Sequence, residues 1–131
     1  MGKITISNKP LANESLRINP RKGKIKFEGT ILKYRDKDTR QIVIFVPSLD
    51  LTSYGATDKK AEEMIDFSLE DFFAWLIKLS PTQIESELKA LGWKHVKYKN
   101  KEYSQTYVDE DGTIQNFNAV ADKVERLTIM A

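Results

Sequence analysis

Residues 45–79 read FVPSLDLTSYGATDKKAEEMIDFSLEDFFAWLIKL, and this run carries the chain from a strand into a long helix. Pro47 has no backbone N–H to donate to a sheet, so the strand is expected to end there. Gly55 suits a tight turn or a close backbone approach. Thr57 is a typical N-cap, because its hydroxyl accepts a hydrogen bond from the first helical turn. The run therefore predicts a strand, a short polar crossing, and a helix that begins at Thr57.

The helical part of this run has one apolar stripe. Residues spaced by three and four form it: Ala61, Ile65, Leu69, Phe72, Leu76 and Leu79. Three further residues are expected to widen it: Met64, Phe73 and Trp75. The stripe predicts that this helix packs on a sheet.

Phe67 does not follow the stripe, and at about 100° per residue it falls among charged side chains on the far side of the helix. One interpretation is that Phe67 packs under the segment that follows. The other is a contact with a partner protein or a second copy of the chain, since an exposed aromatic within a polar rim marks an interface. The acids around it form either a solvated face or a docking surface for a basic partner. The residues predicted to contact a partner are Glu63, Phe67, Glu70 and Asp71.

Length and composition predict one ordinary globular domain covering residues 1–131. The chain is 40% hydrophobic and 31% charged, and it is long enough to bury a core. Its net charge of +2 is too small to indicate nucleic-acid binding by itself. The absence of cysteine excludes disulfides and cysteine-ligated zinc. No membrane span or signal peptide is seen, so no membrane partner is expected and cytoplasm is the expected location.

The segments before residue 45 predict a polar arm and a hairpin. Residues 1–22 are expected to be a polar N-terminal arm with at most a short edge strand. Residues 24–34 alternate as a strand in which Gly29 marks a bulge, and residues 40–46 form a dense β-branched run typical of a central strand. A short third strand is expected between Leu49 and Tyr54.

A second helix is predicted directly after the first. Ser80 fits the N-cap, Pro81 the first helical position, and Gln83 the reciprocal position of a capping box. Gly92 is placed to end this helix. Residues 99–131 are expected to form a C-terminal β extension, with a hairpin turn at 109–112 and a last strand from Val124 to Met130.

The sequence shows no catalytic, cofactor or metal constellation. His95 is the only histidine and its neighbours are lysines, which oppose a bound cation. The six glycines are scattered, so they do not form a phosphate-binding loop. We therefore expect neither an enzyme nor a cofactor.

An alternative function is binding of single-stranded RNA or DNA through residues 93–107, WKHVKYKNKEYSQTY. Lysines neutralise phosphates and aromatic rings stack on bases. The residues that this alternative requires are Trp93, Lys94, Lys97, Tyr98, Lys99 and Lys101. The same pattern is also typical of a half-buried hairpin with its aromatics inward and its lysines outward.

The run IVIFVPSLDLTSYGATDKKAEEMI, residues 42–65, resembles the HicB-like antitoxin domain. Members of that family show a strand, Pro-x-Leu, a polar stretch ending in Gly, then x-Thr and a helix rich in acids and alanine. The matching positions are Phe45, Pro47, Leu49, Gly55, Thr57 and Ala61. The resemblance covers residues 24–98, and no helix-turn-helix or ribbon-helix-helix DNA-binding segment is seen beside it.

The resemblance implies an α+β fold with the order β-β-β-α-α-β, a partial RNase H-like sheet packed by the long helix. It also implies a non-catalytic protein-binding module that neutralises a small basic, toxin-like partner. A homo-oligomer is compatible with the same reading.

Overall fold

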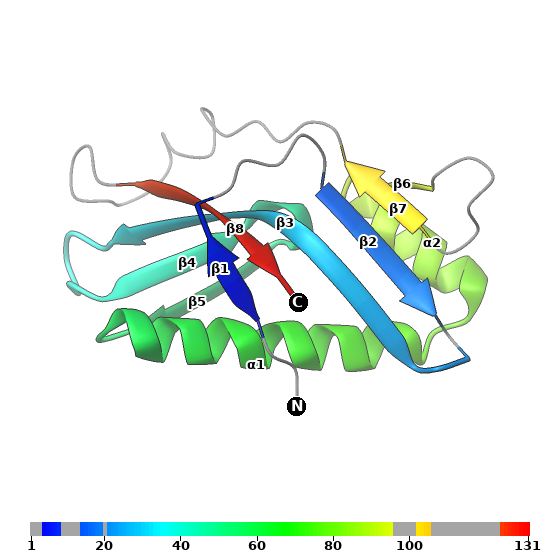
Figure 1. Ribbon diagram of the computed structural model, residues 1–131, viewed down its shortest axis with the longest axis horizontal. Helices are drawn as coiled ribbons and strands as arrows, with labels where there is room; N and C mark the ends of the chain where they lie inside the picture. Colours follow the sequence, from blue (N-terminus) through cyan, green and yellow to red (C-terminus); the bar gives the residue numbers. More distant parts are fainter. Residues whose placement is uncertain (1–3, 9–13, 20, 96–101, 106–123) are drawn as a thin grey trace.

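A computed structural model describes residues 4–8, 14–19, 21–95, 102–105 and 124–131. The fold is α+β, as predicted: an antiparallel sheet packed with two helices (Figure 1). The described strands are β1 (Thr5–Ser7), β2 (Glu14–Asn19), β3 (Lys24–Arg35), β4 (Ile42–Val46), β5 (Leu51–Gly55), β6 (Lys94–His95), β7 (Glu102–Gln105) and β8 (Glu125–Met130). The helices are the 3₁₀ turn η1 (Pro47–Leu49), α1 (Asp58–Ile77) and α2 (Pro81–Ala90).

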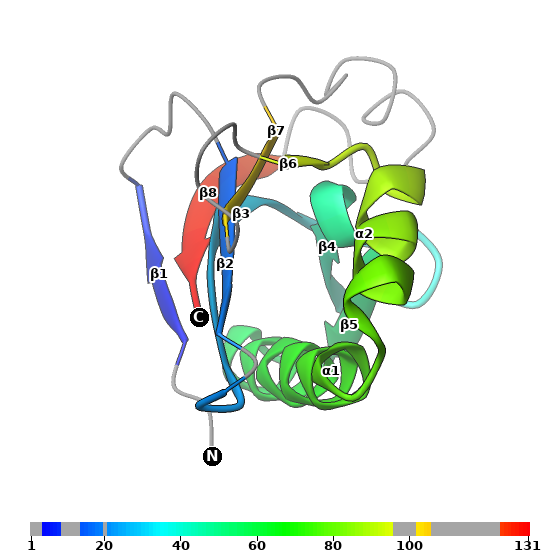
Figure 2. The ribbon, with the colours of Figure 1, turned by 90° about the vertical axis from the view of Figure 1, so that its right-hand side faces the viewer.

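Strand β3 is the centre of the sheet, because it pairs with three other strands, β2, β4 and β8. β8 pairs with one edge over residues 28–33. The other edge is shared by two strands, since β2 pairs with residues 24–28 and β4 with residues 32–35. The sheet therefore forks along β3. In Figure 2 the β2 branch and the β4–β5 branch stand on opposite sides of the molecule, and α1 crosses the base between them.

The fork falls at Gly29, where the sequence predicted a bulge. The register with β8 runs through Gly29 without interruption, so the change is in the partner on the opposite edge. At this point the buried carboxylate of Glu14 accepts a hydrogen bond from the backbone N–H of Thr30 at 2.9 Å. A Cβ on Gly29 would lie 2.3 Å from the ring of Phe27 and 2.7 Å from Glu14 Oε1. Glycine is therefore required sterically where the sheet divides.

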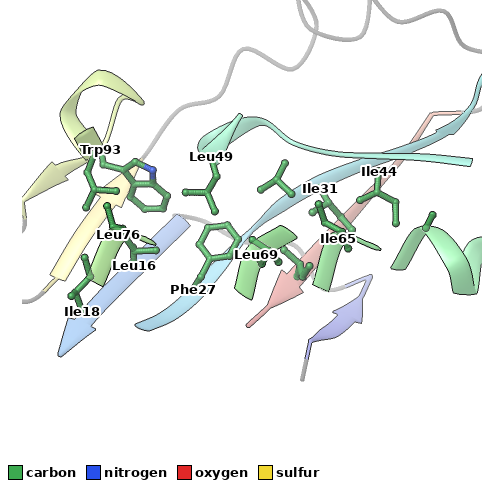
Figure 3. Packing of buried hydrophobic residues seen from close by; sticks show 14 of the residues in the cluster. Leu16, Ile18, Phe27, Ile31, Ile44, Leu49, Ile65, Leu69, Leu76 and Trp93 are labelled. Carbon is green, nitrogen blue, oxygen red and sulfur yellow. The ribbon is translucent and has the colours of Figure 1, made fainter. Parts of the chain in front are cut away.

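The core lies between the two branches and α1 (Figure 3). Phe27 is central in it, with its ring 6.1 Å from that of Trp93 and 6.2 Å from that of Phe73. Leu16 and Ile18 of β2 are also buried, at 0% and 3% exposure. Residues 14–19 therefore belong to the sheet and the core, which corrects the expectation of a polar arm over residues 1–22. Their alternating apolar residues are what a strand with one buried face requires.

Helix α1 forms as the sequence predicted. Thr57 caps it by accepting a hydrogen bond from the N–H of Lys60 at 3.2 Å. Ala61, Ile65, Leu69 and Leu76 are buried along its inner side. A Cβ on Gly55 would lie 2.5 Å from the backbone nitrogen of Ala61, so glycine permits the close approach of β5 to the helix.

Helix α2 begins with the predicted capping box between Ser80 and Gln83. Gly92 follows its end with a φ of 95°, a conformation that favours glycine. The chain then turns Trp93 inward, where its indole N–H donates to the carbonyl of Ser48 at 2.9 Å. This bond joins the residue that follows α2 to η1.

The order β3-β4-β5-α1-α2-β6 agrees with the predicted β-β-β-α-α-β sequence of elements. β6 pairs with β7, and β8 inserts beside β3. The C-terminal extension thus contributes an inner strand of the sheet. The hairpin turn predicted at 109–112 lies outside the described residues.

Candidate functional site

The outer face of α1 exposes three large apolar side chains in one row. Met64 is 46% exposed, Phe67 69% and Trp75 46%. These three residues form the outer face of α1, together with Asp71, which lies between Phe67 and Trp75. Met64 and Trp75 are eleven residues apart, which corresponds to about 16 Å along a helix.

The opposite side of the helix explains why this row faces solvent. The stripe from Ala61 to Leu76 is buried against the sheet, so residues about half a helical turn away must point outward. Lys33 of β3 lies 3.5 Å from Asp58, and this ion pair links the start of the helix to the sheet. Lys33 also lies 3.9 Å from Glu125 of β8. The outer face is therefore displayed on a helix that is fixed at its base.

The exposure of Phe67 excludes one of the two interpretations that the sequence left open. It is not packed under a following segment, since it is the most exposed of the large apolar residues in the described part of the chain. Two of the acids predicted to act with it, Glu63 and Asp71, are exposed near it on the same side of the helix. Glu70 is half-buried and lies on the flank toward β3 and β8.

Met64 and Trp75 are functional candidates whose exposure the sequence pattern did not predict. They were expected to widen the buried stripe, yet both are nearly half exposed. At about 100° per residue they lie roughly 80–100° from Ile65, at the margin of the stripe. The Trp75 ring packs on Phe72, with the centroids 5.8 Å apart. The helical angle identifies such marginal positions, but it does not predict whether their side chains face the core or the solvent.

Asp66 adds a charge that the fold does not favour. Burial and then the neighbouring Glu70 raise the pKa of the Asp66 carboxyl. Asp66 and Glu70 are four residues apart, so their side chains are neighbours on one helical face. This side of α1 therefore holds two acids close together beside apolar residues.

The position of Trp93 removes one of the aromatic residues that the nucleic-acid alternative requires. Trp93 is 3% exposed and its indole is committed to the Ser48 carbonyl, so it cannot stack on a base. Lys94 is exposed on β6. The other residues of that alternative lie outside the described part of the chain: Lys97, Tyr98, Lys99 and Lys101.

Within the described residues, no group of three or more histidine, aspartate or glutamate side chains is placed to hold a metal ion. His95 forms part of β6, where its backbone pairs opposite Tyr103. Over the same residues, no helix has the length and apolar character needed to cross a membrane.

Comparison with known proteins gives no relative: no family model, no curated protein and no solved structure matches this chain.

Proposed function

We propose that this protein is a non-catalytic binding module that holds a small basic protein against the outer face of α1. The observation that carries the proposal is the row of Met64, Phe67 and Trp75, displayed in solvent on a helix fixed to the sheet. Exposed aromatic anchors of this kind supply most of the energy of a protein–protein contact when a partner desolvates them.

The charge of the helix argues for a basic partner. From Asp58 to Asp71 the chain carries six acids and two lysines. Complementary charge raises the rate of association and excludes partners of the same sign. Two copies paired through this face would bring acids together, so the charge favours a different protein over a second copy.

The resemblance to HicB-like antitoxins supports the same proposal from the sequence. The strand, Pro-x-Leu, Gly and Thr positions of that resemblance correspond here to the end of β4, η1, the end of β5 and the cap of α1. We propose on this basis that the partner is toxin-like.

Affinity purification from the source cells tests the proposal, with wild-type protein compared with Phe67→Ala. Tyr54→Ala is the matched control, because Tyr54 is also a large exposed aromatic, 53% accessible, but lies on β5. We expect one small basic protein to co-purify with the wild type and with Tyr54→Ala. Its recovery with Phe67→Ala should fall by about tenfold or more, the usual effect of removing a binding hot spot.

Retention of every co-purifying protein by Phe67→Ala would contradict the proposed face. Light scattering of the purified chain is the companion measurement. A dimer that dissociates on Phe67→Ala substitution would assign the outer face to a second copy and would also contradict the proposal.

A further inference from the structure

The edge of β3 that faces β8 is paired over only part of its length. β8 pairs with residues 28–33. Ala131 extends this ladder by one position, because its N–H donates to the carbonyl of Phe27 at 2.8 Å and its carbonyl accepts from the N–H of Phe27 at 2.9 Å. In Figure 1, β8 ends beside the middle of β3, and β3 continues past it toward β2. Among the described residues, no strand pairs with residues 24–26 on this edge.

The backbone of Ile25 points at this unpaired part of the edge. In an antiparallel sheet the N–H and C=O of one residue point to the same neighbouring strand, and the direction alternates along the chain. Phe27 directs both groups at Ala131, so Ile25 directs both to the same side, while Lys26 directs its own at β2. The ladder therefore has one further position, at Ile25, whose donor and acceptor no described residue uses.

A groove of about 860 Å³ lies beside that position, between β3 and α1. Ile25 and Phe27 line it from the sheet, and Leu69, Phe73 and Ile77 line it from the helix. A residue that pairs with Ile25 places its side chain on the same face of the sheet as Ile25, which is the face toward α1. The groove therefore has room for one large apolar side chain from an added strand.

The opposite face of the same stretch is basic. Lys24 and Lys26 are exposed, and because side chains alternate along a strand they point away from α1. Lys26 pairs opposite Arg17 of β2, so the residue directly across from it is also a cation. The two residues that flank the apolar residue of an added strand would lie opposite these lysines. Acids are favoured there, since opposite charges across a ladder stabilise the pairing.

We propose that this edge of β3 binds an extended segment of a partner protein with the pattern acid–apolar–acid, which continues the ladder beyond Ala131. The N–H and C=O of the apolar residue bond to Ile25, and its side chain enters the groove toward Phe73. The two acids meet Lys24 and Lys26. In strand addition of this kind, the main-chain bonds give affinity and the side-chain contacts give specificity. The site is separate from the outer face and does not rest on the proposed function.

Titration of ¹⁵N-labelled protein with the peptide acetyl-TEFET-amide tests the site. Three matched probes each change one feature. N-methylation of the phenylalanine removes its donor, acetyl-TESET-amide removes the apolar side chain, and acetyl-TKFKT-amide reverses the charge. We expect acetyl-TEFET-amide to shift the amide signals of residues 23–27 and 73–77, with a dissociation constant on the order of 1 mM. Each matched probe should bind about tenfold more weakly.

Hydrogen exchange of the Ile25 amide gives a residue-specific readout. In the free protein this amide should exchange faster than those of Phe27 and Lys26, which are bonded to Ala131 and to β2. Saturation with acetyl-TEFET-amide should slow its exchange. A ligand held only by the apolar groove would leave it fast.

Variants locate the binding. Lys26→Glu should weaken binding of the glutamate peptide and strengthen binding of the lysine peptide. Ala74→Trp, at an exposed position on the groove wall, should block both. Tyr54→Ala on β5 is the control and should bind as the wild type does. The amide spectrum away from the groove reports whether each variant is folded.

Equal affinity for any of the three matched probes would contradict the proposal, because each lacks one feature on which it rests. An Ile25 amide that is already protected in the free protein would overturn it, since the edge would then be occupied. Amide shifts confined to β5 or to the outer face of α1 would place the binding elsewhere and would overturn it as well.

Discussion

Trp93 joins parts of the core that are far apart in the sequence. Its ring packs against Phe27, and its indole N–H reaches the Ser48 carbonyl, 45 positions earlier in the chain. From the sequence, Trp93 belonged equally well to a basic-aromatic surface or to a half-buried hairpin. Periodicity could not decide between them, because the partner that buries it lies in η1.

Trp93→Phe should destabilise the fold by about 1–3 kcal/mol, because it leaves the buried Ser48 carbonyl without its donor. Urea unfolding measures the change. Trp75→Phe is the matched control, since Trp75 is 46% exposed and should change stability by less than about 0.5 kcal/mol. Equal effects of the two substitutions would be inconsistent with the buried hydrogen bond.

Asp66 makes stability depend on pH in a defined direction. Its pKa is raised in the folded state, so its contribution favours folding only while the carboxyl is protonated, and it is lost as the pH rises through that pKa. Asp66→Asn cannot ionise and should be more stable than the wild type at pH 7. The difference should shrink as the pH falls toward the ordinary value of 3.8.

Urea unfolding from pH 3 to pH 7 measures that difference, with Asp71→Asn on the outer face as the control. An Asp66→Asn variant that is less stable than the wild type at pH 7 would refute this account of Asp66.

At the scale of elements, local signals in the sequence predicted most of what forms. Thr57, the capping box of Ser80 and Gln83, and the positive φ of Gly92 all act on neighbouring backbone groups. Such features require no tertiary information. β2 was missed because its six residues lie between two prolines and carry only two strongly apolar side chains.

Ser80→Ala should cost about 1 kcal/mol, because the backbone N–H of Gln83 loses its acceptor, the Ser80 hydroxyl. The reciprocal bond, from the backbone N–H of residue 80 to Gln83 Oε1, does not use the Ser80 side chain. Ser86→Ala, at an exposed position inside the same helix, is the control and should be neutral or slightly stabilising. Thermal unfolding followed by circular dichroism compares the two. No difference between them would mean that the capping box does not stabilise the helix.

At the scale of the whole molecule, the forked sheet was not predictable. Local patterns predict a hairpin and a third strand, but not the insertion of β8 beside β3 from nearly a hundred positions away. The hydrophobic pattern also does not predict that β2 and β4 pair with the same edge of β3. That arrangement follows from tertiary pairing, with Glu14 and Gly29 occupying the point where the two strands diverge.

Gly29→Ala should therefore destabilise the protein by about 1–3 kcal/mol, because the added methyl group meets Phe27 and Glu14. Ser15→Ala, on the exposed side of β2, provides the comparison. Chemical denaturation reports both. Wild-type stability of Gly29→Ala would show that the fork has more space than this packing allows.

Only part of the candidate site could be predicted from the sequence, because the rest depends on tertiary packing. Phe67 and the acids near it follow from helical angle alone, whereas the exposure of Met64 and Trp75 depends on how α1 is rotated on the sheet. A groove also lies beside α1, and it could not be predicted from the helix pattern, because β3 and β8 supply its other wall.

Acrylamide quenching of tryptophan fluorescence tests most directly whether a partner covers the outer face. The chain has two tryptophans: Trp75 is 46% exposed and Trp93 is 3% exposed. The free protein should therefore show one quenchable and one protected component. On addition of the basic protein that co-purifies, we predict that the quenchable component becomes protected. A complex that forms while Trp75 stays fully quenchable would contradict binding through the outer face of α1.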